Sequence, residues 1–242
     1  MRYKCICSYD GSLFHGFQVQ EGLRTVQSEI ETTLKNVLKS DIVIYASGRT
    51  DASVHAIGQV FHFDCELDMT ASQMKRAINS YLPKDIFIKE VEIVDETFHS
   101  RFSAVSKEYH YVIGLDEYNP MNRNYVCYPL YKNIDYKKME EASKIFIGEH
   151  DFRSFCKLGN NENTVRNIES IVFEYGNNQL TIKITGNGFL HNMVRIIVGM
   201  LFEVGKGRID IEYLKDAFEK KDRKYCTKVA PAEGLYLYKV NY

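Results

Sequence analysis

The sequence contains no apolar run of about 18 residues, which is roughly the length that a membrane-spanning helix needs. Its first residues, "MRYKCICSYDG", read as a strand and lack the apolar stretch of a signal peptide. Hydrophobic residues make up 45% of the 242 positions and charged residues 26%, a composition that predicts a sizeable folded core. We therefore expect an intracellular, cytoplasmic enzyme or binding protein with no membrane partner.

Several common site motifs are missing as well. The six cysteines include no C-x-x-C pair, which argues against a structural zinc site. Cys5 and Cys7 would share one strand face as small apolar residues. The sequence has no G-x-G-x-x-G after a strand, no P-loop, no H-E-x-x-H and no G-x-S-x-G. These absences argue against nucleotide-cofactor, metal and serine-hydrolase chemistry.

The net charge of −1 argues weakly against a general nucleic-acid coat, but a sum hides local patches. Residues 220–228, "KKDRKYCTK", hold five basic residues and one acid. This segment is either a solvated helix end or a place that meets phosphates.

Hydrophobic periodicity divides the chain into two α+β halves. In the first half we expect strands at 2–9, 41–47, 54–64 and 85–94, and helices at 25–39 and 70–82, the first capped by Thr25. The order β-α-β-β-α-β is typical of a split βαβ unit, an antiparallel sheet with helices on one face. The fold class is therefore α+β, with two RRM-like or ferredoxin-like halves.

The second half repeats this mixture. We expect strands at 106–115 and 234–242, and two more within 164–186 around a turn at 176–178. We expect helices at 135–150, 189–207 and 209–222, the first with its start set by Asp135. We place the domains at 1–103 and 104–242.

Chemistry in this sequence centres on the connection "YASGRTDASVHA", which carries Asp51 between two strand-like runs. One interpretation is a turn aspartate that accepts backbone N–H bonds. The other is a functional carboxylate, because Arg49 can hold it ionised and the small residues after it leave room for a substrate.

Other residues fit a nucleic-acid partner. Tyr109 and Tyr111 alternate on one strand and so share a face, where aromatic rings either stack on bases or belong to the core. Arg101 and Lys107 flank this strand. Arg195 lies in a mostly apolar helix and needs a carboxylate partner, for which Asp51 and the nearby Glu203 are both candidates.

The motifs resemble those of the tRNA pseudouridine synthase A family. "SGRTDASVHA" is similar to its signature GRTDxGVHA, and "RFSAVSKEYHY" is similar to its RFSAxxKxYxY segment. "FHGFQ", "TVQ", "HDFRSF", "TVRNI", "GFLHNMVRIIVG" and "APAEGLYL" resemble its other blocks, in the same order along nearly the whole chain.

This resemblance implies an isomerase that converts uridine to pseudouridine at tRNA positions 38, 39 and 40, in the anticodon stem-loop. It implies an RNA-binding cleft between the halves, a homodimer, tRNA as partner and no cofactor. The implied catalytic residues are Asp51 as nucleophile or base, Tyr109 for base stacking and proton transfer, and Arg195 as the partner of Asp51. Arg49 would help to flip the base and Leu235 would line the uracil pocket, with Lys107 and Arg101 also binding substrate.

The sequence departs from the family pattern at three places. Ser53 stands where glycine is usual, Asn192 where a second histidine is usual, and Ala232 where proline is usual. If the glycine has a positive φ, Ser53 is strained. Three rival functions remain open: an RNA-binding module without activity, the same chemistry on another RNA uridine, and an unrelated aspartate-dependent hydrolase.

Overall fold

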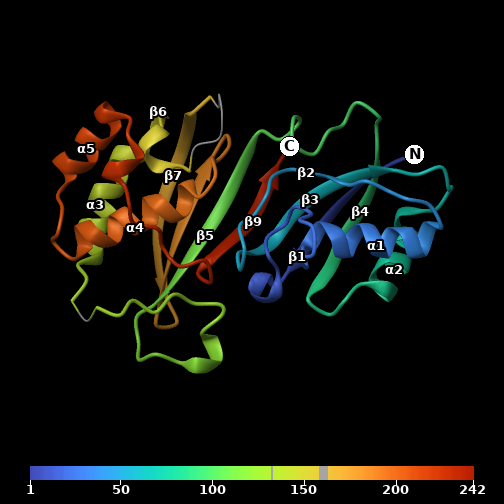
Figure 1. Cartoon of the computed structure of the whole chain (residues 1–242), viewed down its shortest axis with the longest axis horizontal. Coiled ribbons are helices and arrows are strands. Elements are labelled where there is room, and N and C mark those ends of the chain that lie inside the picture. Colours follow the sequence, from blue (N-terminus) through green and yellow to red (C-terminus); the bar gives the residue numbers. More distant parts are fainter. Residues whose placement is uncertain (132, 158–162) are drawn as a thin grey trace. The chain divides into compact units, whose positions relative to one another are not determined.

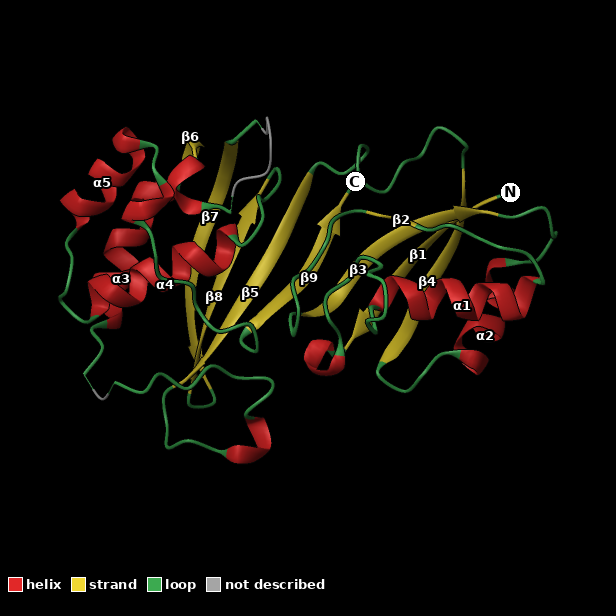
Figure 2. Cartoon of the chain, in the orientation of Figure 1, coloured by secondary structure: helices red, strands yellow, loops and turns green. Residues whose placement is uncertain are grey.

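The computed structural model describes residues 1–131, 133–157 and 163–242, which fold into two units (Figure 1). Unit 1 comprises Met1–Val105 together with Tyr236–Tyr242, and unit 2 comprises Ser106–Leu235. Each unit contains a sheet and helices (Figure 2), so the predicted α+β class is confirmed. Within the described ranges, no helix combines the length and apolar character needed to cross a bilayer.

The sheet of unit 1 has the strand order β4-β1-β3-β9. The strands are β1 (Arg2–Tyr9), β2 (Tyr45–Ala46), β3 (His55–Asp64), β4 (Ile86–Val94) and β9 (Leu235–Asn241). β1 is antiparallel to both β3 and β4, β2 pairs antiparallel with β3, and β9 runs parallel to β3. Every second residue of β1 is buried, including Cys5 and Cys7, as the sequence predicts.

Two helices cover the core of unit 1, α1 (Val26–Leu38) and α2 (Ala71–Tyr81). Each begins with a capping box, in which the threonine before the helix accepts from the N–H three residues on. The caps are Thr25 and Thr70, and Thr25 was predicted. The buried stripe of α1 is Val26, Ile30, Leu34 and Leu38, at the predicted spacing.

The sheet of unit 2 has the order β5-β8-β7-β6, with antiparallel neighbours. Its strands are β5 (Ser106–Gly114), β6 (Gly148–Asp151), β7 (Val165–Gly176) and β8 (Gln179–Gly186), and its helices are α3 (Tyr136–Ser143), α4 (Met193–Gly205) and α5 (Ile211–Lys220). The predicted turn between β7 and β8 is present, with Asn177 and Asn178 in the left-handed region that a two-residue hairpin turn needs. In α4 every residue except Arg195 is buried.

Three sequence predictions differ from the structure. The strand expected at 41–47 is reduced to Tyr45–Ala46, the only part that pairs with β3. The helix expected at 135–150 begins after its predicted cap Asp135 but ends at Ser143. A short 3-10 helix and strand β6 follow, and β6 starts at Gly148, whose φ of +102° is incompatible with a continued helix.

The third difference concerns the last strand. The sequence places residues 234–242 with the second half, but Tyr236–Tyr242 belongs to unit 1. β9 pairs there with β3, and the Tyr236 ring stacks on His55 with 4.8 Å between centroids. Gly58 permits the close approach, because a Cβ at this position would lie 2.4 Å from the Tyr238 carbonyl oxygen. The units divide after Val105, two residues beyond the expected boundary.

Candidate active site

Asp51 lies in unit 1, in the loop between β2 and β3. We call residues 47–54 the Asp51 loop. Its first residue stays in register with β3, because the Ser47 N–H donates to the Val60 carbonyl at 2.8 Å. The Ser47 hydroxyl also donates to the Gln59 amide oxygen at 2.8 Å, and the Gln59 side chain donates back to the Gly48 carbonyl at 3.0 Å. The loop therefore starts from a fixed point on the sheet.

The middle of the Asp51 loop is held by backbone hydrogen bonds from residues 14–17. The Phe17 N–H donates to the Thr50 carbonyl at 3.0 Å, and the Ser53 N–H donates to the Phe14 carbonyl at 3.2 Å. These bonds lie on either side of Asp51, whose side chain is half-buried. The position of the carboxylate is therefore set by the backbone around it.

Two glycines allow this close packing. A Cβ on Gly11 would lie 2.0 Å from the Val54 carbonyl oxygen, and one on Gly16 would lie 3.0 Å from that of Thr50. Gly16 also has a φ of +92°. A side chain at Gly11 would push the end of the Asp51 loop off its support.

A buried side-chain contact supports the same loop. The Tyr9 and Thr50 hydroxyls are 2.7 Å apart, and both residues are less than 7% exposed. Sequence reasoning missed Tyr9, Gly11 and Gly16, although the glycine in "FHGFQ" was a usable signal for close backbone approach.

Ser53 closes the loop in an unusual conformation. Its φ is +62°, in the left-handed region where residues other than glycine are strained. This confirms the strain expected from the departure at this position.

Arg49 and Arg101 are the other predicted site residues in unit 1. Both are exposed. The Arg101 guanidinium lies 5.8 Å from the centre of the Phe102 ring.

Tyr109, Lys107, Arg195 and Leu235 all belong to unit 2. Tyr109 lies on β5 and is 8% exposed, and its ring meets Phe189 edge-on with 5.1 Å between centroids. Lys107 is half-buried at the start of the same strand, opposite Gly186 of β8. Phe189 precedes α4, so a ring contact links Tyr109 to the segment that leads to Arg195.

Arg195 is fixed by hydrogen bonds to uncharged groups. Its Nε donates to the Ala230 carbonyl at 2.9 Å, and its Nη1 donates to the Asn192 side-chain oxygen at 3.1 Å. Asn192 is one of the departures from the family pattern, and here it accepts from the arginine. The alternative partner Glu203 instead pairs with Lys206 at 2.8 Å and Arg208 at 3.2 Å.

Residues 230–235, which we call the connector, lead into β9 at Leu235 and form hydrogen bonds with both α4 and β5. The Ala230 N–H donates to the Arg195 carbonyl at 2.8 Å, and the Val112 N–H donates to the Gly234 carbonyl at 2.8 Å. The Tyr111 hydroxyl donates to the Pro231 carbonyl at 3.0 Å. Burial raises the pKa of Tyr111 well above its usual value, so this phenol stays neutral and serves as a core donor. Leu235 is 4% exposed.

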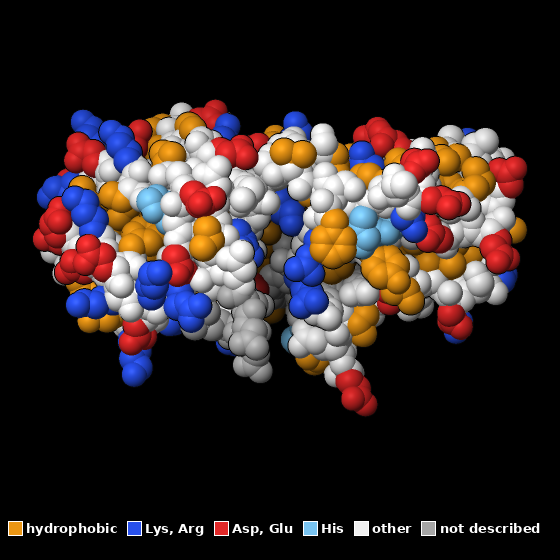
Figure 3. Space-filling view, turned by 90° about the horizontal axis from the view of Figure 1, so that it is seen from above, with side chains coloured by type: hydrophobic (Ala, Val, Ile, Leu, Met, Phe, Trp, Pro, Cys, Tyr) orange, Lys and Arg blue, Asp and Glu red, His pale blue; other side chains and the backbone are white. Residues whose placement is uncertain are grey.

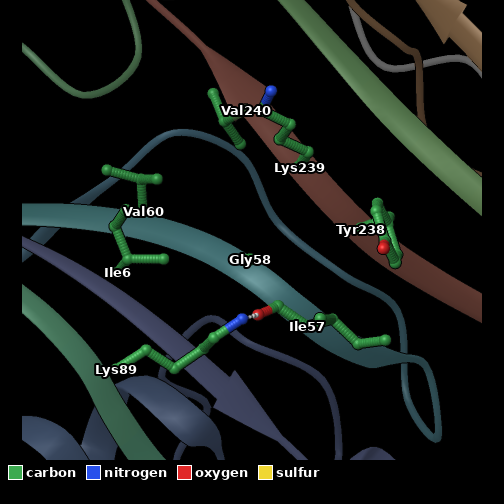
Figure 4. Close-up of a pocket in the computed structure, with 8 residues that line it drawn as sticks. All are labelled: Ile6, Ile57, Gly58, Val60, Lys89, Tyr238, Lys239 and Val240. Atoms are coloured by element: carbon green, nitrogen blue, oxygen red, sulfur yellow. Dashed lines mark hydrogen bonds between the residues drawn. The ribbon is translucent and has the colours of Figure 1, made fainter.

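A pocket of about 260 Å³ lies on the sheet of unit 1, apart from the predicted site residues. Figure 4 shows its lining from β1, β3, β4 and β9, with the Lys89 ammonium donating to the Ile57 carbonyl at 3.0 Å. None of the seven predicted site residues lines it. Among the residues that the structure describes, no cluster of three or more His, Cys, Asp or Glu side chains is arranged to hold a metal ion.

Comparison with known proteins finds tRNA pseudouridine synthases, both with a family model and with individual relatives. A sequence model for tRNA pseudouridine synthases matches residues 6–103 and 142–242. Proteins named tRNA pseudouridine synthase A are similar to the whole chain. Those from Listeria monocytogenes serotype 4b and Geobacillus sp. strain WCH70 are 48% and 46% identical to it, over 99% and 98% of their own lengths. The protein of that name from Bacillus subtilis strain 168 is 44% identical over 99% of its length.

A solved structure, described as an H/ACA RNP bound to a substrate RNA containing 2′-deoxyuridine, matches 87% of this chain and 55% of that chain. The TM-score is 0.36 and the sequence identity is 12%.

Proposed function

Because the chain belongs to the tRNA pseudouridine synthase family, whose members are isomerases, we propose that it converts uridine to pseudouridine in the anticodon stem-loop of tRNA, at positions 38, 39 and 40. The observation that carries this proposal is the similarity to synthases over the full chain, together with a fixed loop that holds Asp51. In this reaction the C1′–N1 bond of the nucleotide breaks and a C1′–C5 bond forms. The hydrogen on C5 leaves as a proton and N1 gains one, so the atoms balance without a co-reactant.

Asp51 is the proposed reacting carboxylate. It acts as a nucleophile on the base or on C1′, or as a base that removes a sugar proton. Support comes from the backbone bonds on both sides of it, which hold a half-buried carboxylate in one place. Preorganisation of this kind favours catalysis, because little reorganisation is needed when the reaction occurs.

Unit 2 supplies the proposed partners of the carboxylate and the base. Arg195 pairs with Asp51 and favours its ionised form. Tyr109 stacks on the uracil and assists proton transfer, and Leu235 lines the uracil pocket. Arg195 and Tyr109 are held by contacts within unit 2 and Leu235 is buried, which limits the ways in which they can move.

The substrate base is stacked in RNA and must leave the stack to react. Arg49 is the residue proposed to take the place of the departing base, and its exposed side chain suits that role. Lys107 and Arg101 contact phosphates, so tRNA binding should weaken as salt concentration rises. The enzyme works as a cytoplasmic homodimer without a cofactor, and catalysis should survive a chelator once the tRNA is folded in monovalent salt.

The first experiment measures tritium released from tRNA labelled at uridine C5, since formation of the C1′–C5 bond expels that hydrogen. Transcripts carry uridine at one of the three positions or only in another arm. We expect release from the three anticodon positions by the wild-type protein. Asp51→Asn should reduce release by about three orders of magnitude or more while tRNA binding persists.

The matched control is Asp41→Asn, which makes the same change at an exposed aspartate of unit 1 that pairs with Lys35. It should release tritium at the wild-type rate. A wild-type rate of tritium release in Asp51→Asn would show that the Asp51 carboxylate does not take part in the reaction. Tritium release only from uridines in other arms would mean that the enzyme modifies a different position of the tRNA. Binding without release from any RNA would mean that the protein is an RNA-binding module without this activity.

A further inference from the structure

A row of aromatic side chains on unit 1 begins at Tyr45, two residues before the Asp51 loop in sequence, and ends at the surface with Phe102. We call it the aromatic step, and it consists of Tyr45, His62, His99 and Phe102. Tyr45 stacks on His62 with 5.2 Å between centroids, His62 meets His99 at 4.7 Å, and His99 meets Phe102 at 4.4 Å. On the right of Figure 3, hydrophobic side chains lie around histidine side chains next to a group of basic ones.

The exposure of the outer rings is unusual. Phe102 is 78% exposed, the highest value for an aromatic residue in the described part of the chain, and Tyr45 is 51% exposed. A ring gains nothing from the hydrophobic effect while it faces water. Exposed aromatic rings that adjoin one another and a cation form the kind of surface on which bases stack.

The aromatic step is rigid because hydrogen bonds fix the segment that carries it. The Ser100 N–H donates to Nδ1 of His62 at 3.2 Å, and the Arg101 N–H donates to Nδ1 of His99 at 3.1 Å. The Ser103 N–H donates to the His99 carbonyl at 2.9 Å, and the Ser103 hydroxyl accepts from the His99 N–H at 3.0 Å. Phe102 therefore projects from a closed turn, so little conformational entropy is lost when something binds to it.

The buried ring of the step, His62, remains neutral at physiological pH. Burial lowers the pKa of His62 to about 4, so its ring acts as an uncharged stacking partner. Positive charge comes from Arg101, whose guanidinium lies 5.8 Å from the centre of the Phe102 ring. An aromatic surface with a neutral buried ring and a cation at its exposed edge matches a nucleotide, which has a flat base and an anionic phosphate.

The step is also within reach of an RNA that occupies the Asp51 loop. Tyr45 and Asp51 are six positions apart, and Ser47 between them is still in register with β3. An extended chain rises about 3.3 Å per residue, which puts the Cα of Tyr45, at one end of the step, at most about 20 Å from the Cα of Asp51. A few nucleotides of single-stranded RNA cover that distance.

We propose that the aromatic step is a second RNA-contact site, where an unpaired base of the substrate tRNA, other than the reacting uridine, stacks on Phe102 while Arg101 contacts the neighbouring phosphate. This inference rests on the proposed function for the identity of the RNA. It adds a stacking position outside the residues assigned to the reacting base.

The test measures the Kd of a fluorescently labelled tRNA transcript by anisotropy, with tritium release measured in parallel. Phe102→Ala should weaken binding about tenfold, the effect of losing one stacked base. Phe102→Tyr keeps the ring and should bind as the wild type does. The matched control is Phe87→Ala, which removes a 52% exposed phenylalanine of unit 1 that also has a cation near its ring, Lys75 at 6.0 Å. It should leave the Kd unchanged.

Abasic transcripts then identify the stacked nucleotide. When the base that stacks on Phe102 is removed, Phe102→Ala should cause no further loss of affinity, because the two changes remove the same contact. A penalty that persists at every abasic position would overturn the stacking assignment. Unchanged affinity in Phe102→Ala would overturn the site itself, as would a change of oligomeric state in place of a change in tRNA affinity.

The two proposals fail in different ways. Absence of tritium release with normal tRNA binding would refute the proposed reaction, and the Phe102 series would still decide the stacking site. Normal release with equal affinity for all Phe102 variants would refute only the stacking site. A wild-type protein that does not bind tRNA would refute both.

Discussion

The Asp51 loop of unit 1 and the Arg195 region of unit 2 are held in place by different means. The Phe17 N–H, the Phe14 carbonyl and the absence of side chains at Gly11 and Gly16 support the loop. Arg195 lies on a regular helix and is aimed by its own Nε and Nη1, which donate to Ala230 and Asn192. Position therefore depends in unit 1 on the main chain, with added contacts from the Ser47 and Thr50 side chains, and in unit 2 on the arginine side chain itself.

This difference determines which substitutions each region tolerates. A loop supported mainly through its backbone has no room for added atoms beneath it, as the close contact at Gly11 shows. A guanidinium that donates from two separate nitrogens to two different acceptors cannot be replaced by another side chain in the same geometry.

The largest expected effect comes from Gly11→Ala. The new Cβ would lie 2.0 Å from the Val54 carbonyl oxygen, so the Asp51 loop must move. We expect a loss of about 3 kcal/mol or more in the free energy of unfolding, with loss of tritium release. Gly176→Ala is the control, because a Cβ there meets nothing within 4 Å. Denaturant unfolding measures the stability and tritium release measures the activity. Full activity and unchanged stability in Gly11→Ala would contradict the view that the bare Cα atom of Gly11 supports the Asp51 loop.

Arg195→Lys tests whether the two hydrogen bonds of the guanidinium are needed to hold position 195 in unit 2. Lysine keeps the charge but cannot donate to Ala230 and Asn192 from two separate nitrogens in the same geometry. We expect about 2 kcal/mol lower stability, a strong reduction of turnover and little change in tRNA affinity.

The control for this change is Arg208→Lys, at an exposed arginine of the same unit that pairs with Glu203. It should alter stability by about 1 kcal/mol or less. Equal turnover in Arg195→Lys and Arg208→Lys would show that charge alone suffices at position 195.

The smallest effect has the opposite sign. Ser53 has a φ of +62°, so Ser53→Gly should relieve strain and stabilise the protein by about 1 kcal/mol. A thermal melt would register this as a rise of about 2–4 °C. Ser80→Gly, in the last turn of α2, should lower the melting temperature slightly, because glycine is a poorer helix former than serine. A destabilised Ser53→Gly variant would mean that the serine side chain contributes to the loop.

Local rules predicted much of the fold. Thr25 and Asp135 were identified as helix caps because capping uses a short polar side chain immediately before an apolar stripe. The prediction that a helix reaches residue 150 was wrong because Gly148 adopts a positive φ. The sequence does not show whether the φ of a glycine is positive or negative. The segment at 41–44 looked like a strand because it is β-branched, but only Tyr45 and Ala46 pair with β3.

The sequence predicted the candidate site less completely than the fold. Asp51 and Arg195 were selected from unusual surroundings and from motif resemblance. The supports of the loop were not, because Tyr9 and Gly11 contact it only through the fold, about 40 residues away in sequence. Ser53 was the exception, since a residue that replaces a usual glycine points directly to backbone strain.

The return of β9 to unit 1 has a consequence for how the protein is made. Unit 1 starts before unit 2 in the chain but is completed only by residues 236–242, which follow it. The Asn241 carbonyl accepts from the Val105 N–H, and the Tyr242 hydroxyl donates to the Ser100 carbonyl. On the ribosome, unit 2 therefore emerges in full before the N-terminal unit can close. Until then β3 lacks its parallel neighbour, and the nascent chain presents an open sheet edge to chaperones.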